Sequence, residues 1–167
     1  MAYGAKIISI NGNFDESLLA VKDISDSLDF EIVNSINPYR LEGQKTGAFE
    51  IIEQLGYSPD FQFIPVGNAG NISSYWKGYK QFYDSKICNE LPVLYGVQAD
   101  GAAPLVDNKI IKNPDTIASA IRIGNPASAD LAKDSINESS GEFMKVSDEN
   151  ILDAQKIIAR KEGIFCE

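Results

Sequence analysis

The stretch "GNAGN", residues 67–71, combines residue types that bind anions through the backbone. It follows the apolar run "FQFIPV" and precedes an aromatic-rich segment with helical spacing, so it falls at a helix N-terminus. Unpaired N–H groups and a partial positive charge at such a terminus attract anions. Glycine permits positive φ and close approach of a phosphate, and asparagine tolerates left-handed backbone. No Asp or Glu occurs from residue 61 to 83, although the chain has 24. The stretch predicts a phosphate site, and a tight turn capped by asparagine is the alternative.

A second candidate anion site is the segment "NSINPYR". Asn37 followed by proline predicts a capped helix, which places Arg40 near the third helical position. A guanidinium grips phosphate with two hydrogen bonds, but a cation at this end opposes the helix dipole unless an anion is present. An exposed Arg40 paired with Glu42 is the alternative. The preceding predicted strand ends in two neutral donors, Asn34 and Ser35. Two such sites together predict a small ligand with one phosphate and a second partner with another.

Composition excludes several classes of function. The chain has 167 residues, a net charge of −9 and no histidine. The acidity argues against a nucleic-acid partner, and the missing histidine excludes Ser-His-Asp triads and the usual zinc sites. Cys88 and Cys166 fit no metal or redox spacing, so we expect free thiols and no metal site. The N-terminus "MAYGAKIISING" has too short an apolar run for a signal peptide or membrane span, and we expect a cytoplasmic protein.

Short β-branched runs alternate with helical patterns along the chain. This alternation predicts an α/β fold with a mostly parallel sheet and helices on both faces, in three layers. Such folds bind ligands where strands lead into helix N-termini, as both candidate sites would. The predicted strands are residues 5–10, 30–36, 61–67, 92–100 and 141–147, and the predicted helices are 15–28, 37–56, 72–83, 114–124 and 147–165. The polar stretch 125–141 is expected to be a surface loop.

Several motifs together carry a family resemblance. They are "VNSINPYRLEGQKT", "IPVGNAGNISSYWKGYKQF", "GVQADGAAPLV", "TIASAIRIGNP" and "EGIFCE". In register over essentially the whole chain, they resemble threonine synthases. These belong to the tryptophan-synthase-β-like, fold type II, family of pyridoxal-phosphate enzymes. Related cysteine synthases use a threonine-glycine loop and dehydratases a nearly all-glycine loop, whereas "GNAGN" before "YWKGY" is typical of threonine synthases.

The resemblance implies roles for the candidate residues. The expected activity is conversion of O-phospho-L-homoserine and water to L-threonine and phosphate, with pyridoxal 5′-phosphate as cofactor, in a homodimer. The residues expected to hold the cofactor phosphate are Gly67, Asn68, Ala69, Gly70 and Asn71. Those expected to hold the substrate phosphate are Asn34, Ser35 and Arg40, with Asn68 reaching it as well.

The sequence also departs from the family pattern. The Schiff-base lysine of the family lies in a Ser-Phe-Lys-Asp context, which this sequence lacks, and the serine-rich stretch after "EGIFCE" is absent as well. The chain therefore looks like the middle of a threonine synthase, with no catalytic residue of its own, and we expect it to be inactive alone. Residues 1–35 are expected to be a remnant of the smaller, cofactor-side domain, and residues 36–167 part of the larger one.

Truncation predicts a physical consequence for the first strand, and two other functions stay open. Strand 5–10 would keep an unpaired edge or lose its place, so we expect oligomers or poor solubility. One alternative function is a non-catalytic module that binds phosphate or a small ligand on the same scaffold. The other is a different type II pyridoxal-phosphate lyase.

Overall fold

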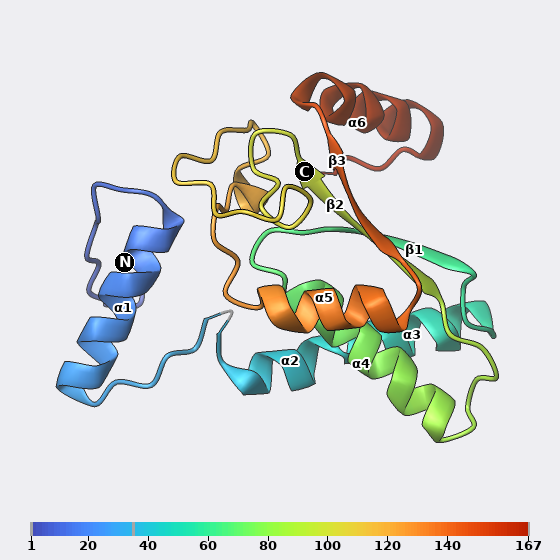
Figure 1. Cartoon of the computed structure of the whole chain (residues 1–167). Helices are drawn as coiled ribbons and strands as arrows, with labels where there is room; N and C mark the ends of the chain where they lie inside the picture. Colours follow the sequence, from blue (N-terminus) through green and yellow to red (C-terminus); the bar gives the residue numbers. More distant parts are fainter. Residues whose placement is uncertain (1, 35, 167) are drawn as a thin grey trace. The chain divides into compact units, whose positions relative to one another are not determined.

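A computed structural model describes residues 2–34 and 36–166, which fall into two compact units (Figure 1). The first unit is Met1–Ile32 and the second is Val33–Glu167. The division lies three residues before the boundary expected from the sequence. That the first unit derives from the smaller domain of the family stays a prediction.

The first unit contains one helix, α1 (Phe14–Leu28), where a helix was predicted. Its start is fixed by a capping box, in which the Asn13 side chain accepts from the Glu16 backbone N–H and the Glu16 carboxylate accepts from that of Asn13. The strand predicted over residues 5–10 is not formed. A strand needs a neighbour for its N–H and C=O groups, and no strand occurs among the described residues of this unit. The segment has thus lost its place in a sheet.

The second unit is built around a parallel sheet of three strands in the order β1-β2-β3. Phe61 pairs with Val93 and Tyr95 with Glu142, so consecutive strands lie side by side. The strands are β1 (Phe61–Pro65), β2 (Val93–Ala99) and β3 (Glu142–Val146). The helices are α2 (Pro38–Gln44), α3 (Thr46–Leu55), α4 (Gly70–Asp84), α5 (Ala129–Glu138) and α6 (Asp148–Glu162), with a 3₁₀ turn η1 (Ser119–Ile121). The predicted α/β class and the parallel sheet are confirmed.

The hydrophobic core lies between one face of the sheet and helix α4. Ile64 and Leu94 face this core from the strands, and Ile72, Trp76 and Tyr79 face it from α4. Trp76 is only 5% exposed, and its Nε1–H donates to the Glu138 carboxylate of α5 at 2.7 Å. Helix α4 therefore packs against both the sheet and α5.

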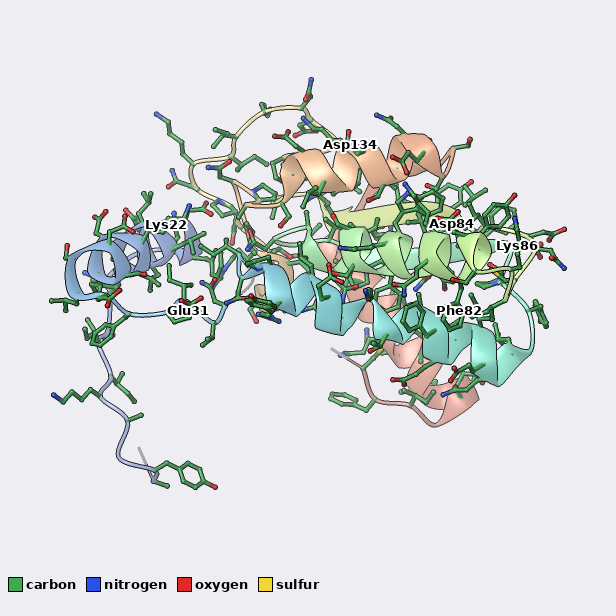
Figure 2. All side chains as sticks on the ribbon, turned by 90° about the horizontal axis from the view of Figure 1, so that it is seen from below. Lys22, Glu31, Phe82, Asp84, Lys86 and Asp134 are labelled. Carbon is green, nitrogen blue, oxygen red and sulfur yellow. The ribbon has the colours of Figure 1, made fainter. Side chains whose placement is uncertain are left out.

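Helices α3 and α4 approach each other closely at Gly78. A Cβ at this position would lie 2.3 Å from the Lys45 carbonyl oxygen and 2.9 Å from the Ala48 Cβ. Phe82 follows one helical turn later (Figure 2). Its ring stacks on that of Phe49 of α3, with ring centroids 4.1 Å apart. Gly78 carries the cost of a glycine inside a helix because only a residue without a side chain permits this contact.

The helix-covered face of the sheet carries α4 and α5, and α6 lies on the other side of the sheet (Figure 1). Helix α6 is capped by Ser147, whose hydroxyl accepts from the Asn150 N–H. It ends at Gly163, φ 69°, whereas the predicted helix ran to residue 165. The helix predicted over 37–56 has its expected ends at Asn37 and Gly56. It is divided at Lys45 into α2 and α3.

Three further sequence-based expectations are wrong. Residues 30–33 form no strand, residues 114–124 form only η1, and the expected loop 125–141 contains α5. Asp148 of α6 accepts from the Thr116 hydroxyl and from the Ile117 N–H, which holds that segment in an irregular path. The apolar residues at 117, 121 and 123 imitate helical spacing, but these distant hydrogen bonds outweigh local propensity.

Candidate functional site

Strand β1 leads through Val66 into the predicted phosphate loop, and α4 begins there as expected. Its N-cap is Ala69, whose methyl group provides no acceptor, and no acidic residue lies in the first turn. Side chains cap α1 (Asn13), α2 (Asn37) and α6 (Ser147), whereas α3 and α5, like α4, have no side-chain cap. The N-terminus of α4 therefore presents backbone donors with partial positive charge and no side-chain partner at the cap.

The backbone of the loop differs in one respect from the expectation. Ala69, rather than a glycine of the loop, is in the left-handed region, at φ 67° and ψ −1°. Such a conformation costs a non-glycine residue about 1–2 kcal/mol. Gly67 is needed for space, since a Cβ there would lie 3.0 Å from the Ala120 carbonyl oxygen and 3.1 Å from the Ile121 Cα. The segment around η1 therefore packs directly against the loop.

Asn68 ties the loop to the start of α5. Its Oδ1 accepts from the Ala127 N–H at 2.7 Å, and its backbone oxygen accepts from the Ser128 N–H at 3.2 Å. These contacts join residues 59 and 60 positions apart along the sequence, so no local pattern could have revealed them. The Asn68 side chain, expected at the substrate phosphate, is thus first a structural clamp whose amide oxygen is fixed by Ala127.

Gln98 holds the strand residue next to the phosphate loop, and the sequence analysis did not identify this residue. The side chain is only 1% exposed and lies at the end of β2. Its Nε2 donates to the Val66 carbonyl at 3.3 Å, and its Oε1 accepts from the Leu105 N–H at 2.9 Å. A polar residue within the otherwise apolar run "PVLYGVQA" was the available signal, because a buried amide is found where it satisfies backbone groups. Gln98 thereby fixes the residue from which the phosphate loop departs.

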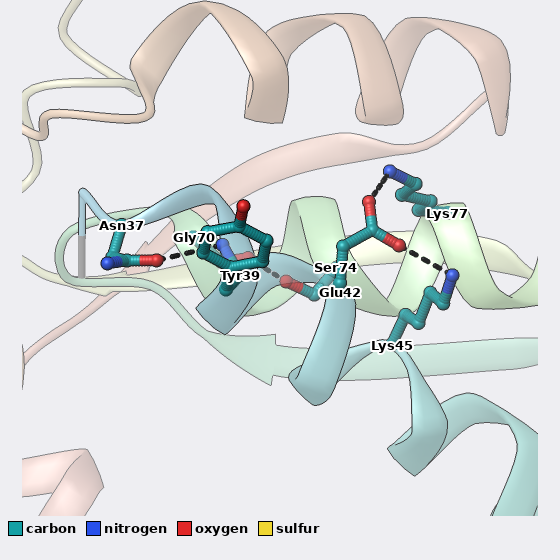
Figure 3. Close-up of polar contacts among 7 residues, drawn as sticks. All are labelled: Asn37, Tyr39, Glu42, Lys45, Gly70, Ser74 and Lys77. Carbon is teal, nitrogen blue, oxygen red and sulfur yellow. Dashed lines mark hydrogen bonds and ion pairs between the residues drawn. The ribbon is translucent and has the colours of Figure 1, made fainter. Parts of the chain in front are cut away.

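The second candidate site surrounds the start of α2, which packs against α4 (Figure 3). Asn37 caps α2 by accepting from the Tyr39 N–H at 2.9 Å, and Arg40 occupies the third helical position as predicted. Asn34 forms a tight turn, with its Oδ1 accepting from the Ile36 N–H at 3.1 Å. Ser35 lies outside the described residues. Neither Asn34 nor Arg40 follows a strand here, contrary to the expectation.

Arg40 is exposed and does not pair with Glu42. The Gln44 amide lies beside its guanidinium, and with the oxygen facing that group it accepts from Nε at 3.3 Å and Nη2 at 2.9 Å. Among residues 2–34 and 36–166, no carboxylate forms an ion pair with Arg40. The positive charge of Arg40 is therefore not neutralised by the described part of the chain.

Glu42 bridges two lysines instead. Lys45 donates to its Oε2 at 2.6 Å, and Lys77 of α4 contacts its Oε1 (Figure 3). These hydrogen bonds, from Lys45 first and then Lys77, lower the pKa of Glu42 to about 2. Glu42 thus joins α2 to α4 through its ion pairs with these two lysines.

Together, these contacts form a cradle of backbone donors at residues 67–71, at the N-terminus of α4. On the neighbouring helix α2, Arg40 has no ion-pair partner within the described residues. The loop is fixed by Gln98, by Asn68 and by the segment around η1, so its donors are ordered without a ligand. Preorganised donors bind anions with little ordering cost. The arrangement can hold a phosphate group.

A sequence model of the family described as "Pyridoxal-phosphate dependent enzyme" matches residues 1–167. The chain belongs to this family. The cradle at residues 67–71 fits the family's cofactor in one respect that the structure itself shows, because an uncapped helix N-terminus without acidic residues can receive its phosphate.

Curated relatives carry the name threonine synthase. The protein of Synechocystis is 51% identical over 167 residues, which are 100% of this chain and 44% of that protein. The protein of Methanocaldococcus jannaschii is 54% identical over 176 aligned residues, covering 100% of this chain and 44% of that one. The protein of Mycobacterium tuberculosis is 52% identical over 166 residues, which cover 99% of this chain and 46% of that protein. The chain spans about half the length of the curated relatives it matches.

Solved structures of other proteins share the fold. Maize serine racemase matches with a TM-score of 0.76 at 22% identity, covering 98% of this chain and 49% of that one. The processed form of threonine deaminase isoform 2 from Solanum lycopersicum also matches with a TM-score of 0.76 at 22% identity, covering 99% and 45%. At these identities the likeness shows the architecture alone. Within the described residues, no helix has the length and apolar character needed to cross a membrane.

Proposed function

We propose that this chain is the phosphate-binding core of a threonine synthase. The complete enzyme would convert O-phospho-L-homoserine and water to L-threonine and phosphate. About 50% identity to curated threonine synthases across the whole chain supports the assignment. The structural observation that carries it is the start of α4 at Ala69, where ordered backbone donors have neither a side-chain cap nor an acidic neighbour.

In the proposed enzyme, the residues of this chain bind and orient two phosphate groups. The backbone donors of residues 67–71 hold the phosphate of pyridoxal 5′-phosphate, which, when bound, supplies an electron sink for chemistry at Cα and Cβ of an amino acid. Arg40 grips the phosphate of the substrate, assisted by Asn34, Ser35 and Asn68. A guanidinium held there stabilises the charge that grows on the phosphate as it leaves Cγ.

We assign no lysine of this sequence to the role of anchoring the cofactor, which a lysine has in this family. The "Ser-Phe-Lys-Asp" context is missing, and Lys45, Lys77 and Lys80 are engaged with carboxylates. We therefore assign no catalytic residue to the chain, and we expect the 167 residues alone to release no phosphate from O-phospho-L-homoserine above background. The complete enzyme is proposed to act as a homodimer in the cytoplasm.

Binding of the isolated chain tests the cradle. Equilibrium dialysis should show pyridoxal 5′-phosphate binding about tenfold or more tightly than pyridoxal, because only the phosphate forms charge-assisted hydrogen bonds with α4. Asn68→Asp keeps the acceptor for Ala127 but adds a negative charge, and it should remove the preference. Equal affinity for the two compounds would contradict the cradle.

The reaction is tested in a chimera, namely the Synechocystis threonine synthase whose matching segment is replaced by these 167 residues. The chimera should release phosphate from O-phospho-L-homoserine and form L-threonine. A folded chimera that binds pyridoxal 5′-phosphate without turnover would favour the non-catalytic module. Conversion of L-threonine or L-serine to a keto acid and ammonia would instead favour a different type II lyase, in which Arg40 has no role.

A further inference from the structure

The segment that packs against the phosphate loop, residues 115–124, follows an irregular path. It begins at Asp115, whose N–H donates to the Gly101 oxygen at 3.0 Å. Further along, residues 117–121 line a cleft of about 510 Å³. Atoms that border a cleft lack packing partners on that side, so packing holds this part of the chain less firmly than it holds the core. Hydrogen bonds must therefore do more to fix the path of the segment.

Asp148, the first residue of α6, supplies such hydrogen bonds from a distant part of the sequence. Its Oδ1 accepts from the Thr116 hydroxyl at 2.5 Å, and its Oδ2 accepts from the Ile117 N–H at 3.0 Å. The Thr116 oxygen accepts in turn from the Ala118 N–H at 3.1 Å. Thr116 is only 4% exposed, so water competes little for these bonds. One carboxylate and one hydroxyl thus fix three consecutive residues before η1.

The 3₁₀ turn η1 connects these hydrogen bonds to the phosphate loop. Ala118 is the N-cap of η1. Two residues later, the Ala120 oxygen and the Ile121 Cα lie 3.0 and 3.1 Å from the place of a Cβ on Gly67. At such close contact, a small displacement of η1 changes the space that the loop can occupy, because interiors are close-packed. Donors that hold an anion must stay within a fraction of an ångström of their places.

We propose that Asp148 is a positioning residue for the phosphate loop. It acts through Thr116 and η1, and it fixes where the backbone donors of residues 67–71 lie. The role assigned to Asp148 rests on the proposed function of this loop as the site of the cofactor phosphate. It adds a carboxylate of α6 to the groups that determine how tightly that phosphate is held.

The first test needs no ligand. In two-dimensional amide NMR spectra of the 167-residue chain, Thr116→Val should shift the resonances of Gly67 and Gly70. Valine keeps the branched shape of threonine but removes the hydroxyl that donates to Asp148. Asp148→Ala should shift the same resonances further, since both hydrogen bonds to the segment are lost. Thr116→Ser keeps the hydroxyl and should leave the two glycine resonances near their wild-type positions.

The second test measures the affinities for pyridoxal 5′-phosphate and pyridoxal by equilibrium dialysis. Thr116→Val should reduce the preference for the phosphate-bearing compound about threefold to tenfold, the effect of weakening about one hydrogen bond. Thr116→Ser should keep the preference. The ratio of the two affinities is decisive, because a general loss of folded protein lowers both affinities alike. A displaced loop lowers only the affinity that depends on the phosphate.

Ser139 provides a matched control. It is 5% exposed and follows the end of α5, whereas Asn68 is hydrogen-bonded to the start of that helix. Its hydroxyl donates to the Ile136 oxygen at 3.1 Å and accepts from the Leu94 N–H at 3.4 Å. Ser139→Ala therefore removes a buried hydroxyl with two partners, as Thr116→Val does. It should change neither the resonances of the phosphate loop nor the preference for pyridoxal 5′-phosphate.

Unchanged resonances of Gly67 and Gly70 in folded Thr116→Val would overturn the inference, as would shifts of equal size in Ser139→Ala. It would also fail if Thr116→Val kept the full preference of the wild type for pyridoxal 5′-phosphate. If Asp148→Ala does not fold, Thr116→Val decides. A wild-type chain with no preference between the two compounds would reject the proposed cofactor site, and the glycine resonances would still show whether Asp148 fixes the loop.

Discussion

The loop at residues 67–71 and the segment at residues 34–40 both lead into a helix N-terminus, and both carry residue types suited to phosphate. The loop follows β1, packs against the segment around η1 and is clamped to the start of α5 by Asn68. The segment at 34–40 follows no strand and leads into a helix of seven residues, with Arg40 exposed. The first site is part of the core, whereas the second is displayed on the surface.

This difference separates the binding of a resident group from the binding of a passing one. Donors fixed by distant contacts lose little entropy on binding and suit a cofactor that stays. An exposed arginine on a short helix keeps its freedom until a ligand orders it, which suits a substrate that must also leave. Substitutions in the two regions should therefore differ in kind: those in the loop should change stability, and those at Arg40 should change binding only.

The sharpest contrast is between two glycines. Gly67→Val should destabilise the chain by about 1–3 kcal/mol, because even the Cβ would crowd the backbone of Ala120 and Ile121. Gly43 of α2 has open space where a methyl group would lie, and Gly43→Ala should leave stability unchanged or raise it by about 0.5–1 kcal/mol. Urea unfolding followed by circular dichroism measures both. Similar losses for the two variants would remove the distinction between the regions.

The next largest effect is expected at the clamp. Asn68→Ala leaves the Ala127 N–H without its acceptor and should cost about 0.5–1.5 kcal/mol in urea unfolding. Asn68→Asp keeps that acceptor and should stay near wild-type stability while losing the preference for pyridoxal 5′-phosphate over pyridoxal. The pair separates the structural role of Asn68 from its role in binding. If both variants kept the stability of the wild type and its preference for pyridoxal 5′-phosphate, Asn68 would have neither role.

Arg40→Ala should leave the free energy of unfolding within about 0.5 kcal/mol of wild type, since the side chain is exposed and lacks a carboxylate partner within the described residues. In the chimera it should lower kcat/KM for O-phospho-L-homoserine by about 10–100-fold, the loss expected for charge-assisted hydrogen bonds to one phosphate. Arg40→Lys should recover part of this activity. Unchanged turnover by Arg40→Ala would place the substrate phosphate elsewhere.

The smallest effect is expected at Glu42 and depends on pH. Its pKa is about 2 in the folded chain, below the ordinary value of 4.5, so its contribution to stability is complete above about 4.5 and is lost as the pH falls toward 2. Glu42→Gln should remove this part of the acid dependence and little else, since the group is exposed. Thermal unfolding between these pH values, at low and high salt, measures it. If the wild type and Glu42→Gln lost stability identically as the pH falls, Glu42 would not bridge Lys45 and Lys77 in solution.

Sequence patterns correctly predicted those structural features that neighbouring residues determine. The caps at Asn37, Ser147 and Gly56 are formed by neighbouring residues and lie at the ends of the predicted helices. The three strands of the sheet were also predicted, from short runs rich in apolar residues. The predicted start of a helix after "GNAGN" was also correct. In the candidate site, the sequence therefore indicated the loop and the position of Arg40 on its helix.

The predictions that were wrong concern segments whose structure depends on residues far away in the sequence. Residues 5–10 have strand composition, but no neighbouring strand pairs with them among the described residues. Residues 114–124 have helical spacing, but Asp148 holds Thr116 and Ile117 in another path. Ala69 adopts the left-handed conformation, although the loop contains two glycines. Gln98 and Asn68 form their hydrogen bonds with residues that are distant in the sequence. Spacing along one chain does not encode these contacts.

Trp76 is the only tryptophan of the chain, and it lies two turns along the helix that begins at the phosphate loop. Its indole is buried, and its N–H is held by Glu138. The intrinsic fluorescence of the protein under tryptophan-selective excitation therefore comes from one known place, between α4 and α5. A shift of emission to longer wavelength would report separation of these two helices, with no label attached. The chain thus contains its own optical reporter for the integrity of the site.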